Sequence, residues 1–342
     1  MSPTPTRMAG LRLPALLLAL VLSLVLAACG SADEPAADDA AGQPQGAFPI
    51  SVQHKYGATE ISSEPKRVVT LGLTDQDAAL ALDVKPVGAI DWFKERPYGK
   101  WPWAKDLWGA ETPEIVGERD DYNMEKIAAL KPDLILAVYS GMTKEQYETL
   151  SKIAPVVGQA KGHDDYAAPW QDMTRQVGKA LGKADEVEEL ISAIMARFEA
   201  IREEHAEFAE QTLVVADSFE PGKYTAFTST DAKAIFFSEL GFTLSPEVDK
   251  LAKQGWNAAE FSAERLDLLD VDRLVWGTAS TEANERIKAE PLYKKLDVAK
   301  ENRDLFVPYQ DPDIGAAFSF NTVLSIPYAI DEMLPLLTAD TK

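Results

Sequence analysis

The chain carries few side chains that catalyse reactions, and they form no recognisable catalytic pattern. Its three histidines, His54, His163 and His205, lie far apart. No G-x-S-x-G, H-E-x-x-H, P-loop or G-x-G-x-x-G motif occurs, so neither a nucleophile with its base nor a phosphate cradle is indicated. A site for a bare zinc or manganese ion normally uses several imidazoles, or histidine together with carboxylates. We therefore expect neither an enzyme nor a resident metal, although carboxylate ligation of a metal stays open.

The single cysteine is a candidate site of covalent modification. Cys29 follows an apolar run over residues 13–26, and two arginines precede that run. Such a run is typical of a signal-peptide core and is shorter than the roughly 20 apolar residues of a membrane span. With Leu-Ala-Ala before it and Gly30 after it, Cys29 resembles the modified cysteine of a bacterial lipobox. The resemblance implies cleavage after residue 28 and a diacylglycerol anchor on Cys29, outside the cytoplasmic membrane; the alternative is a chance cysteine behind an ordinary signal peptide.

Composition separates a tether from a folded body. Residues 29–47 are rich in Ala, Asp, Glu, Pro, Gly and Gln, which predicts a flexible tether because such a stretch buries too little to offset its chain entropy. The formal net charge is -21, and loss of the two arginines in residues 1–28 makes it -23. Nucleic acid and anionic lipid are therefore poor partners. Residues 48–342 are numerous enough for two domains of ordinary size.

Short apolar runs alternate with longer amphipathic segments through this body, which is typical of parallel sheets covered by helices. Helices are expected at residues 75–82 and 232–240. The strands are expected at residues 67–71, 86–90, 133–138, 212–216, 273–276 and 305–308. The fold class is therefore α/β, with Rossmann-like lobes built around parallel sheets.

A long helix is predicted in the middle of the chain. Residues 183–208 contain neither Gly nor Pro, and their apolar positions follow i, i+3, i+4 spacing over about seven turns. We expect this helix to join an N-terminal lobe over residues 48–182 to a C-terminal lobe over residues 209–342. The cleft between two lobes is then the default binding site.

An internal repeat supports two similar lobes. The twelve residues from Glu125 align without a gap with the twelve from Glu264, 139 positions later. Glu, an aliphatic residue, Leu and Asp recur in register. The alignment predicts, in each lobe, a short helix, a turn ending at Asp133 or Asp272, and then a buried strand. Glu125 and Glu264 would occupy equivalent places.

A series of ordered segments with a shared pattern extends over nearly the whole mature chain. The segments are Glu64-Pro-Lys-Arg-Val-Val-Thr, Val116-Gly-Glu, Asn123-Met-Glu-Lys-Ile-Ala-Ala-Leu-Lys-Pro-Asp-Leu-Ile, Ile153-Ala-Pro-Val-Val, Gly178-Lys-Ala-Leu-Gly, Ser262-Ala-Glu-Arg-Leu and Phe318-Ser-Phe-Asn-Thr-Val-Leu-Ser-Ile-Pro-Tyr. With this ordered series the sequence resembles the iron-siderophore binding proteins of ATP-driven importers. The resemblance implies two α/β lobes bridged by one long helix, and a monomer without a covalent cofactor apart from the lipid. It also implies a ferric siderophore as ligand and the permease subunits of an ABC importer as partner.

The resemblance also implies individual roles. Residues 116–125 fit the pattern Val-Gly-x-Arg-x-x-x-Asn-x-Glu of ferric-hydroxamate binding proteins, which gives Arg119 the place of a cleft arginine. A guanidinium suits the anionic oxygens around ferric iron. Trp256 lies eight residues before Glu264, where the family has a cleft tryptophan that offers flat apolar area. Tyr139 falls close to a family tyrosine in a looser alignment.

Two further cargo contacts and two docking residues complete the expected site. Trp92 and Phe219 follow expected strands, at the edge where α/β sheets bind ligands. In the family, one glutamate from each lobe meets arginines of the transporter, and here Glu125 and Glu264 take those places. Their alternative role is to stabilise a helix N-terminus through its dipole.

Other cargoes stay open. The residues after Tyr139 depart from the hydroxamate binders, so catecholate, mixed or carboxylate siderophores remain alternatives to a hydroxamate. Haem or a corrinoid is the nearest rival, with Tyr139 as a possible axial ligand of haem. An enzyme that processes the chelate is a further alternative, disfavoured by the missing motifs.

Overall fold

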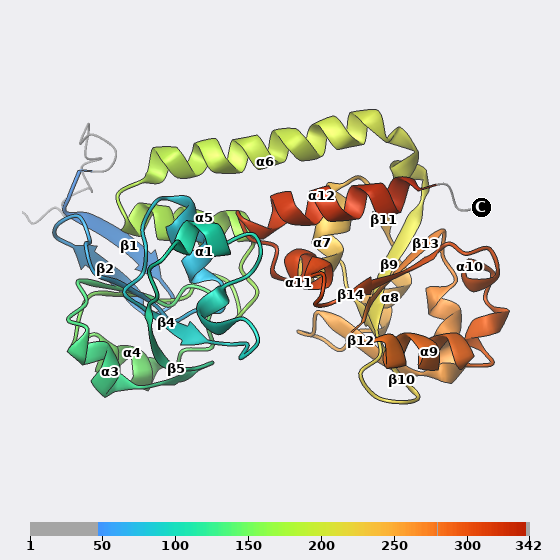
Figure 1. Cartoon of the computed structure of the whole chain (residues 1–342), viewed down its shortest axis with the longest axis horizontal. Coiled ribbons are helices and arrows are strands. Elements are labelled where there is room, and N and C mark those ends of the chain that lie inside the picture. The colour runs from blue at the N-terminus through green and yellow to red at the C-terminus, as the bar shows by residue number, and fades with distance from the viewer. Residues whose placement is uncertain (1–46, 279, 340–342) are drawn as a thin grey trace, which may run out of the picture. The chain divides into compact units, whose positions relative to one another are not determined.

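The computed structural model describes residues 47–278 and 280–339 (Figure 1). The expected signal peptide over residues 1–28, the expected lipidation site Cys29 and the expected tether up to residue 46 lie outside the described residues. Among the described residues, no helix is long and apolar enough to cross a bilayer.

The N-terminal lobe combines a hairpin with a six-stranded sheet. The hairpin pairs β1 (Ile50–His54) with β2 (Gly57–Ile61), and the sheet has the order β6-β5-β4-β3-β7-β8. Its strands are β3 (Val68–Thr70), β4 (Gly88–Asp91), β5 (Glu114–Glu118), β6 (Asp121–Tyr122), β7 (Leu134–Leu136) and β8 (Val156–Val157). The helices are α1 (Asp75–Ala81), η1 (Pro97–Gly99), α2 (Lys105–Trp108), α3 (Met124–Ala129), α4 (Lys144–Leu150) and α5 (Trp170–Ala180).

The C-terminal lobe also has six strands, in the order β12-β10-β9-β13-β14, with β11 paired to β9. Its strands are β9 (Thr212–Asp217), β10 (Lys223–Phe227), β11 (Thr243–Leu244), β12 (Ala258–Ser262), β13 (Arg273–Thr278) and β14 (Asp304–Pro308). Its helices are η2 (Ala206–Glu210), α7 (Ala232–Glu239), α8 (Pro246–Leu251), η3 (Ala263–Leu269), α9 (Thr281–Ala289), η4 (Tyr293–Lys295), α10 (Asp297–Lys300), α11 (Ile314–Phe320) and α12 (Ser325–Thr338).

The α/β architecture agrees with the sequence analysis, but the sheets are mixed rather than wholly parallel. Strands β3, β4, β5, β7 and β8 are parallel, as are β9, β11, β13 and β14. Strands β6, β10 and β12 are antiparallel to their neighbours. Loop length explains part of this, because residues 218–222 are too few for the crossover that parallel strands need.

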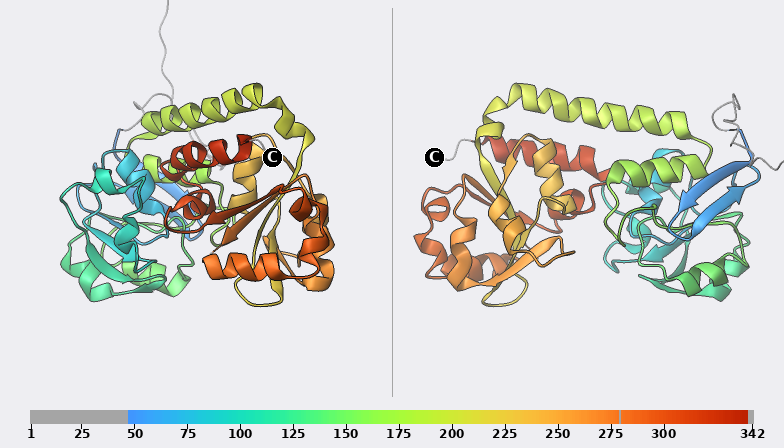
Figure 2. Two further views of the ribbon diagram at one scale, coloured as in Figure 1. Left: turned by 45° about the vertical axis from the view of Figure 1, so that its right-hand side comes forward. Right: turned by 180° about the vertical axis from the view of Figure 1, so that it is seen from behind.

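The long helix α6 (Ala184–Glu204) joins the two lobes and buries Val187, Ile191, Ile194, Phe198 and Ile201. The predicted helix ended four residues later, at 208; the chain instead leaves the α-helix at His205 and continues as the 3₁₀ turn η2. Figure 2 shows α12 running beside α6, where Arg197 of α6 forms an ion pair with Asp331 of α12.

The internal repeat is visible in the hydrogen bonding. Asp133 precedes β7 and accepts the backbone N–H groups of Lys66 and Arg67, each at 2.8 Å, at the start of β3. Asp272 precedes β13 and accepts the N–H of Thr212, at the start of β9, also at 2.8 Å. In both lobes the repeated aspartate therefore ties its own strand to the first strand of the sheet.

Candidate binding and docking sites

The carboxyl ends of the parallel strands in the two lobes face each other. Arg96, in the loop after β4, forms an ion pair at 3.0 Å with Asp313, in the loop after β14. Asp313 is only 3 % exposed, so this contact is enclosed. Phe93 and Trp101 pack on Phe320 of α11, with ring centroids 5.5 and 5.1 Å apart. Ligands of open α/β sheets bind at such strand ends, so the candidate site lies here.

Three of the expected cargo residues converge on one wall of the N-terminal lobe. The Arg119 guanidinium lies 5.9 Å from the ring centre of Trp92. The ring of Tyr166 stands edge-on to Trp92 at 5.8 Å and to Tyr139 at 5.5 Å. We call Trp92, Arg119, Tyr139 and Tyr166 the aromatic wall. Sequence reasoning missed Tyr166, because it lies in an irregular polar segment between β8 and α5.

The negative charge of Asp231, in the C-terminal lobe, acts on Tyr139 of the aromatic wall. Burial, with a smaller contribution from the negative charge of Asp231, raises the pKa of Tyr139 to about 12. Asp231 is the N-cap of α7 and accepts a 2.7 Å hydrogen bond from the Asn257 side chain. Asn257 directly follows Trp256, whose side chain is 56 % exposed. Trp256 therefore lies next in sequence to a residue bonded to Asp231, and the interaction of Asp231 with Tyr139 is electrostatic.

Phe219 lies elsewhere. It precedes the Lys223 end of β10, which pairs with Ser262, whereas Trp256 lies beyond the Phe227–Ala258 pair at the other end. Phe219 is 73 % exposed, and within the described residues it has no ring contact with the aromatic wall. The structure thus brings together Arg119, Trp92 and Tyr139, whereas Trp256 is exposed beside Asn257 in the other lobe and Phe219 lies at the opposite end of β10.

Charges around these residues are nearly balanced. Each lobe contributes one cation that lies over a tryptophan: Arg119 over Trp92, and Lys253 at 5.1 Å over Trp256. Neither cation has an ion pair among the described residues. Asp91 and Asp120 lie beside Arg119 in the N-terminal lobe, and in the C-terminal lobe a third cation, Lys233, forms an ion pair with Asp231 at 3.4 Å and acts on the charge of Asp217. Burial raises the pKa of Asp217 to about 7, against the opposing charge of Lys233.

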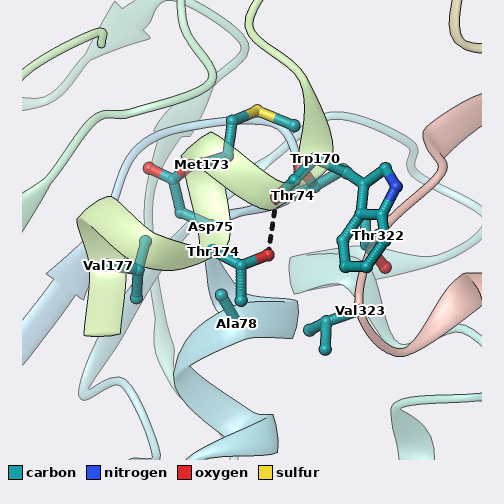
Figure 3. A pocket seen from close by; sticks show the side chains of 9 residues that line it. All are labelled: Thr74, Asp75, Ala78, Trp170, Met173, Thr174, Val177, Thr322 and Val323. Carbon is teal, nitrogen blue, oxygen red and sulfur yellow. Dashed lines mark hydrogen bonds between the residues drawn. The ribbon is translucent and has the colours of Figure 1, made fainter. Parts of the chain in front are cut away.

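An enclosed cavity beside this region is too small for a ligand. It has a volume of about 10 Å³ and lies between α1, α5 and the segment that joins α11 to α12 (Figure 3). Trp170, Met173 and Val177 of α5 line one side, and the hydroxyl of Thr174 is turned back to the backbone oxygen of Trp170 at 2.7 Å. Such a space holds about one water molecule.

Two buried carboxylates lie at the start of α1, and one of them holds the chain at the aromatic wall. Asp75 accepts the backbone N–H groups of Gly72, Val138 and Tyr139 at 2.8–3.1 Å and so fixes the chain that carries Tyr139. Asp77 accepts hydrogen bonds from Thr322 at 2.7 Å and from Trp103 at 2.9 Å. It thereby ties α1 to the turn before α12. Burial outweighs these hydrogen bonds and raises the pKa of each carboxyl to about 6.

A pH effect on stability follows for Asp77. The pKa of Asp77 in the folded protein lies above its usual value of 3.8. Between about pH 4 and 6, the folded protein therefore keeps a proton on Asp77 that the unfolded chain has lost. This stabilisation is complete below pH 4 and is lost as the pH rises through 6. We expect Asp77→Asn to remove this pH dependence. When the pH falls from 7 to 5, the free energy of unfolding of wild type should therefore rise by about 1 kcal/mol relative to that of the variant. Urea unfolding of both proteins at the two pH values measures the difference, and a constant difference would contradict it.

The two glutamates expected to dock the transporter occupy matching positions. Glu125 lies in the first turn of α3, and Glu264 lies in the first turn of η3. Both are exposed, and neither has a hydrogen bond or ion pair among the described residues. Glu125 is not the N-cap of its helix, because the Asn123 side chain caps α3 by accepting the N–H of Lys126 at 3.0 Å. The carboxylates are therefore available to a partner.

No group of three or more His, Cys, Asp or Glu side chains that could hold a metal ion occurs among the described residues. Residues 71–308 match the model of a protein family described as "Periplasmic binding protein". The chain belongs to this family. The periplasmic binding proteins bind substrates rather than transform them, so the expectations of a two-lobed α/β fold and of a protein that is not an enzyme are confirmed.

Three relatives show the range of ligands within this family. The structure of PiaA from Streptococcus pneumoniae in complex with ferrichrome has 30% identity and a TM-score of 0.70, covering 84% of this chain and 97% of that one. SirA from Staphylococcus aureus complexed with staphyloferrin B has 27% identity and a TM-score of 0.71, covering 85% and 99%. The probable siderophore-binding lipoprotein YfiY of Bacillus subtilis is 28% identical, covering 83% of this chain and 79% of YfiY. The resemblance to iron-siderophore binding proteins is confirmed.

Proposed function

We propose that this periplasmic binding protein captures a ferric siderophore between its lobes and delivers it to an ABC importer. The observation that carries the proposal is the aromatic wall, whose Arg119 has no ion pair among the described residues and whose Tyr139 is influenced by the charge of Asp231 on the other lobe. The relatives named for ferrichrome, staphyloferrin B and siderophore binding support the same class of cargo.

Each residue of the site has a defined task in this proposal. Arg119 donates charge-assisted hydrogen bonds to the oxygens that surround ferric iron, without displacing them from the metal. Trp92, Tyr139 and Trp256 cover the apolar linkers of the siderophore. Phe219 remains a predicted contact without a link to these residues.

Charge favours a hydroxamate among the siderophore classes. Hydroxamate groups balance the charge of ferric iron, so their complexes are close to neutral, whereas catecholate and citrate complexes carry net negative charge. Arg119 and Lys253 have no ion pair among the described residues, but the carboxyl groups of Asp91 and Asp120 lie beside Arg119, and the C-terminal lobe adds those of Asp217 and Asp231 against Lys233. The negative charge of a strongly anionic chelate would therefore be poorly compensated by the cations of the site. At short range, each unbalanced charge weakens binding.

Haem is the second cargo that the site must be weighed against, with Tyr139 as its axial ligand. A tyrosine ligates haem iron through its phenolate. Burial raises the pKa of Tyr139 to about 12, and the carboxylate of Asp231 opposes a second negative charge beside it. Tyr139 is thus suited to donate a hydrogen bond to cargo rather than to bind iron.

We also propose that the mature protein is held outside the membrane by lipid on Cys29, and that Glu125 and Glu264 dock the permease. The first rests on the lipobox-like sequence and on relatives named as lipoproteins. The second rests on the matching exposed positions of the two carboxylates in the repeat. The tether over residues 29–47 would give the folded body its reach.

Tryptophan fluorescence tests the cargo. We expect ferrichrome to quench the emission of the purified protein saturably, because Trp92 and Trp256 border the site. Iron-free ferrichrome, ferric citrate and ferric enterobactin should bind more weakly. Saturable binding of haem or cobalamin, with no response to any ferric siderophore, would refute the proposed function.

A further inference from the structure

Asp120 connects three segments that are distant in the sequence. Its Oδ1 accepts the backbone N–H of Gly141 at 3.0 Å and the hydroxyl of Tyr122 at 3.1 Å, and its Oδ2 accepts the hydroxyl of Tyr166. The backbone oxygen of Asp120 accepts a 2.7 Å hydrogen bond from the Gln146 side chain. One residue therefore joins the β5–β6 turn, the loop after β7, and the segment before α5.

Each of these segments carries a member of the aromatic wall. Arg119 directly precedes Asp120, Tyr139 lies two residues before Gly141, and Tyr166 is bonded through its own hydroxyl. Because that hydroxyl is occupied by Asp120, Tyr166 presents its ring edge to Trp92 and Tyr139. The carboxylate of Asp120 is engaged on both oxygens by these donors.

The conformations of this region need such a restraint. Arg119 has φ = 54° and Tyr166 has φ = 59°, in the left-handed region that residues other than glycine rarely adopt. Such conformations persist where surrounding contacts hold them. The approach is also close, since a Cβ on Gly141 would lie 2.9 Å from the Tyr166 hydroxyl and 3.1 Å from Asp120 Oδ2.

We propose that Asp120 is the positioning residue of the cargo site: its carboxylate holds Arg119 and the rings of Tyr139 and Tyr166 in the arrangement that receives the ferric chelate. This inference rests on the proposed function and extends it. A site held in its bound arrangement spends less free energy on ordering when cargo arrives. Loss of Asp120 should therefore weaken cargo binding chiefly through Arg119.

A double-mutant cycle with ferrichrome tests the coupling. Asp120→Ala should weaken ferrichrome affinity about tenfold in the wild-type background but less than about twofold in the Arg119→Ala background, because two residues coupled through a shared backbone position are not additive. Asp120→Asn keeps an acceptor oxygen and the side-chain shape, and should restore most of the affinity. Asp121→Ala, which removes the same charge at the next, exposed position, should leave the affinity unchanged.

Near-ultraviolet circular dichroism of the cargo-free protein gives an independent signature. Asp120→Ala and the single-hydroxyl change Tyr166→Phe should both reduce the signal of the aromatic wall, and Tyr166→Phe should cost about threefold in affinity if Asp120→Ala fails to fold. Additive losses in the cycle, or an unchanged spectrum, would overturn the role of Asp120 while leaving the cargo assignment in place. Failure of the wild type to bind any ferric siderophore would overturn both.

Discussion

Replacing Arg119 with alanine should weaken the binding of ferrichrome by one to two orders of magnitude and leave the melting temperature unchanged. Loss of a hydrogen bond to a charged group costs about 1.5–3 kcal/mol, which corresponds to that range of affinity. Stability should not change, because Arg119 is exposed and has no ion pair within the described part of the chain. Isothermal titration calorimetry and thermal melting measure the two quantities.

Two further variants make this result specific. Arg119→Lys keeps the charge but not the planar fork of donors, so it should recover only part of the affinity. Arg175→Ala removes an arginine that is paired with Glu188 on the surface, and it should leave ferrichrome binding unaltered. If Arg119→Ala binds ferrichrome as tightly as wild type does, Arg119 is a surface residue and not a cargo contact.

The double change Glu125→Ala with Glu264→Ala should abolish cargo-stimulated ATP hydrolysis by the reconstituted importer, with ferrichrome affinity and melting nearly unaltered. Truncating one partner of an interfacial charge pair costs about 2–5 kcal/mol when the pair is buried and less at the rim. Two such losses, one on each lobe, would dissociate the complex with the permease. The stimulated hydrolysis rate at fixed protein concentration is the measurement.

A matched control separates docking from general loss of negative charge. Glu199→Ala with Glu203→Ala removes two exposed carboxylates from α6 and changes the net charge equally. That variant should stimulate ATP hydrolysis as wild type does. Normal stimulation by the Glu125 and Glu264 variant would remove the docking role from both residues.

Much of the fold could be predicted because its signals are local. The apolar spacing that buries Val187, Ile194 and Phe198 identified α6 to within a few residues at each end. The antiparallel edges could not be read in the same way. Strand β6 has only two residues, and the direction of β10 and β12 depends on which neighbours they pair with, not on their own composition.

The residues of the candidate site could likewise be predicted only where the signal is local in the sequence. Arg119 and Glu125 belong to a motif of fixed spacing, which can be recognised in the sequence. Tyr166 and Asp120 meet only through a hydrogen bond across 46 residues, and nothing in the sequence around Tyr166 indicates it. Phe219 and Trp256 were both predicted to contact cargo. The register of the β10–β12 pair, which the sequence does not show, puts them at opposite ends of β10.

Native mass spectrometry of the purified folded protein with an equimolar mixture of ferrichrome, ferric enterobactin, ferric citrate, haem and cobalamin tests the central claim most directly. We predict a single dominant complex whose added mass is that of one ferrichrome molecule, with the iron retained. A dominant complex with haem or cobalamin, or no complex with any ferric siderophore, would contradict the proposal that this protein captures ferric siderophores.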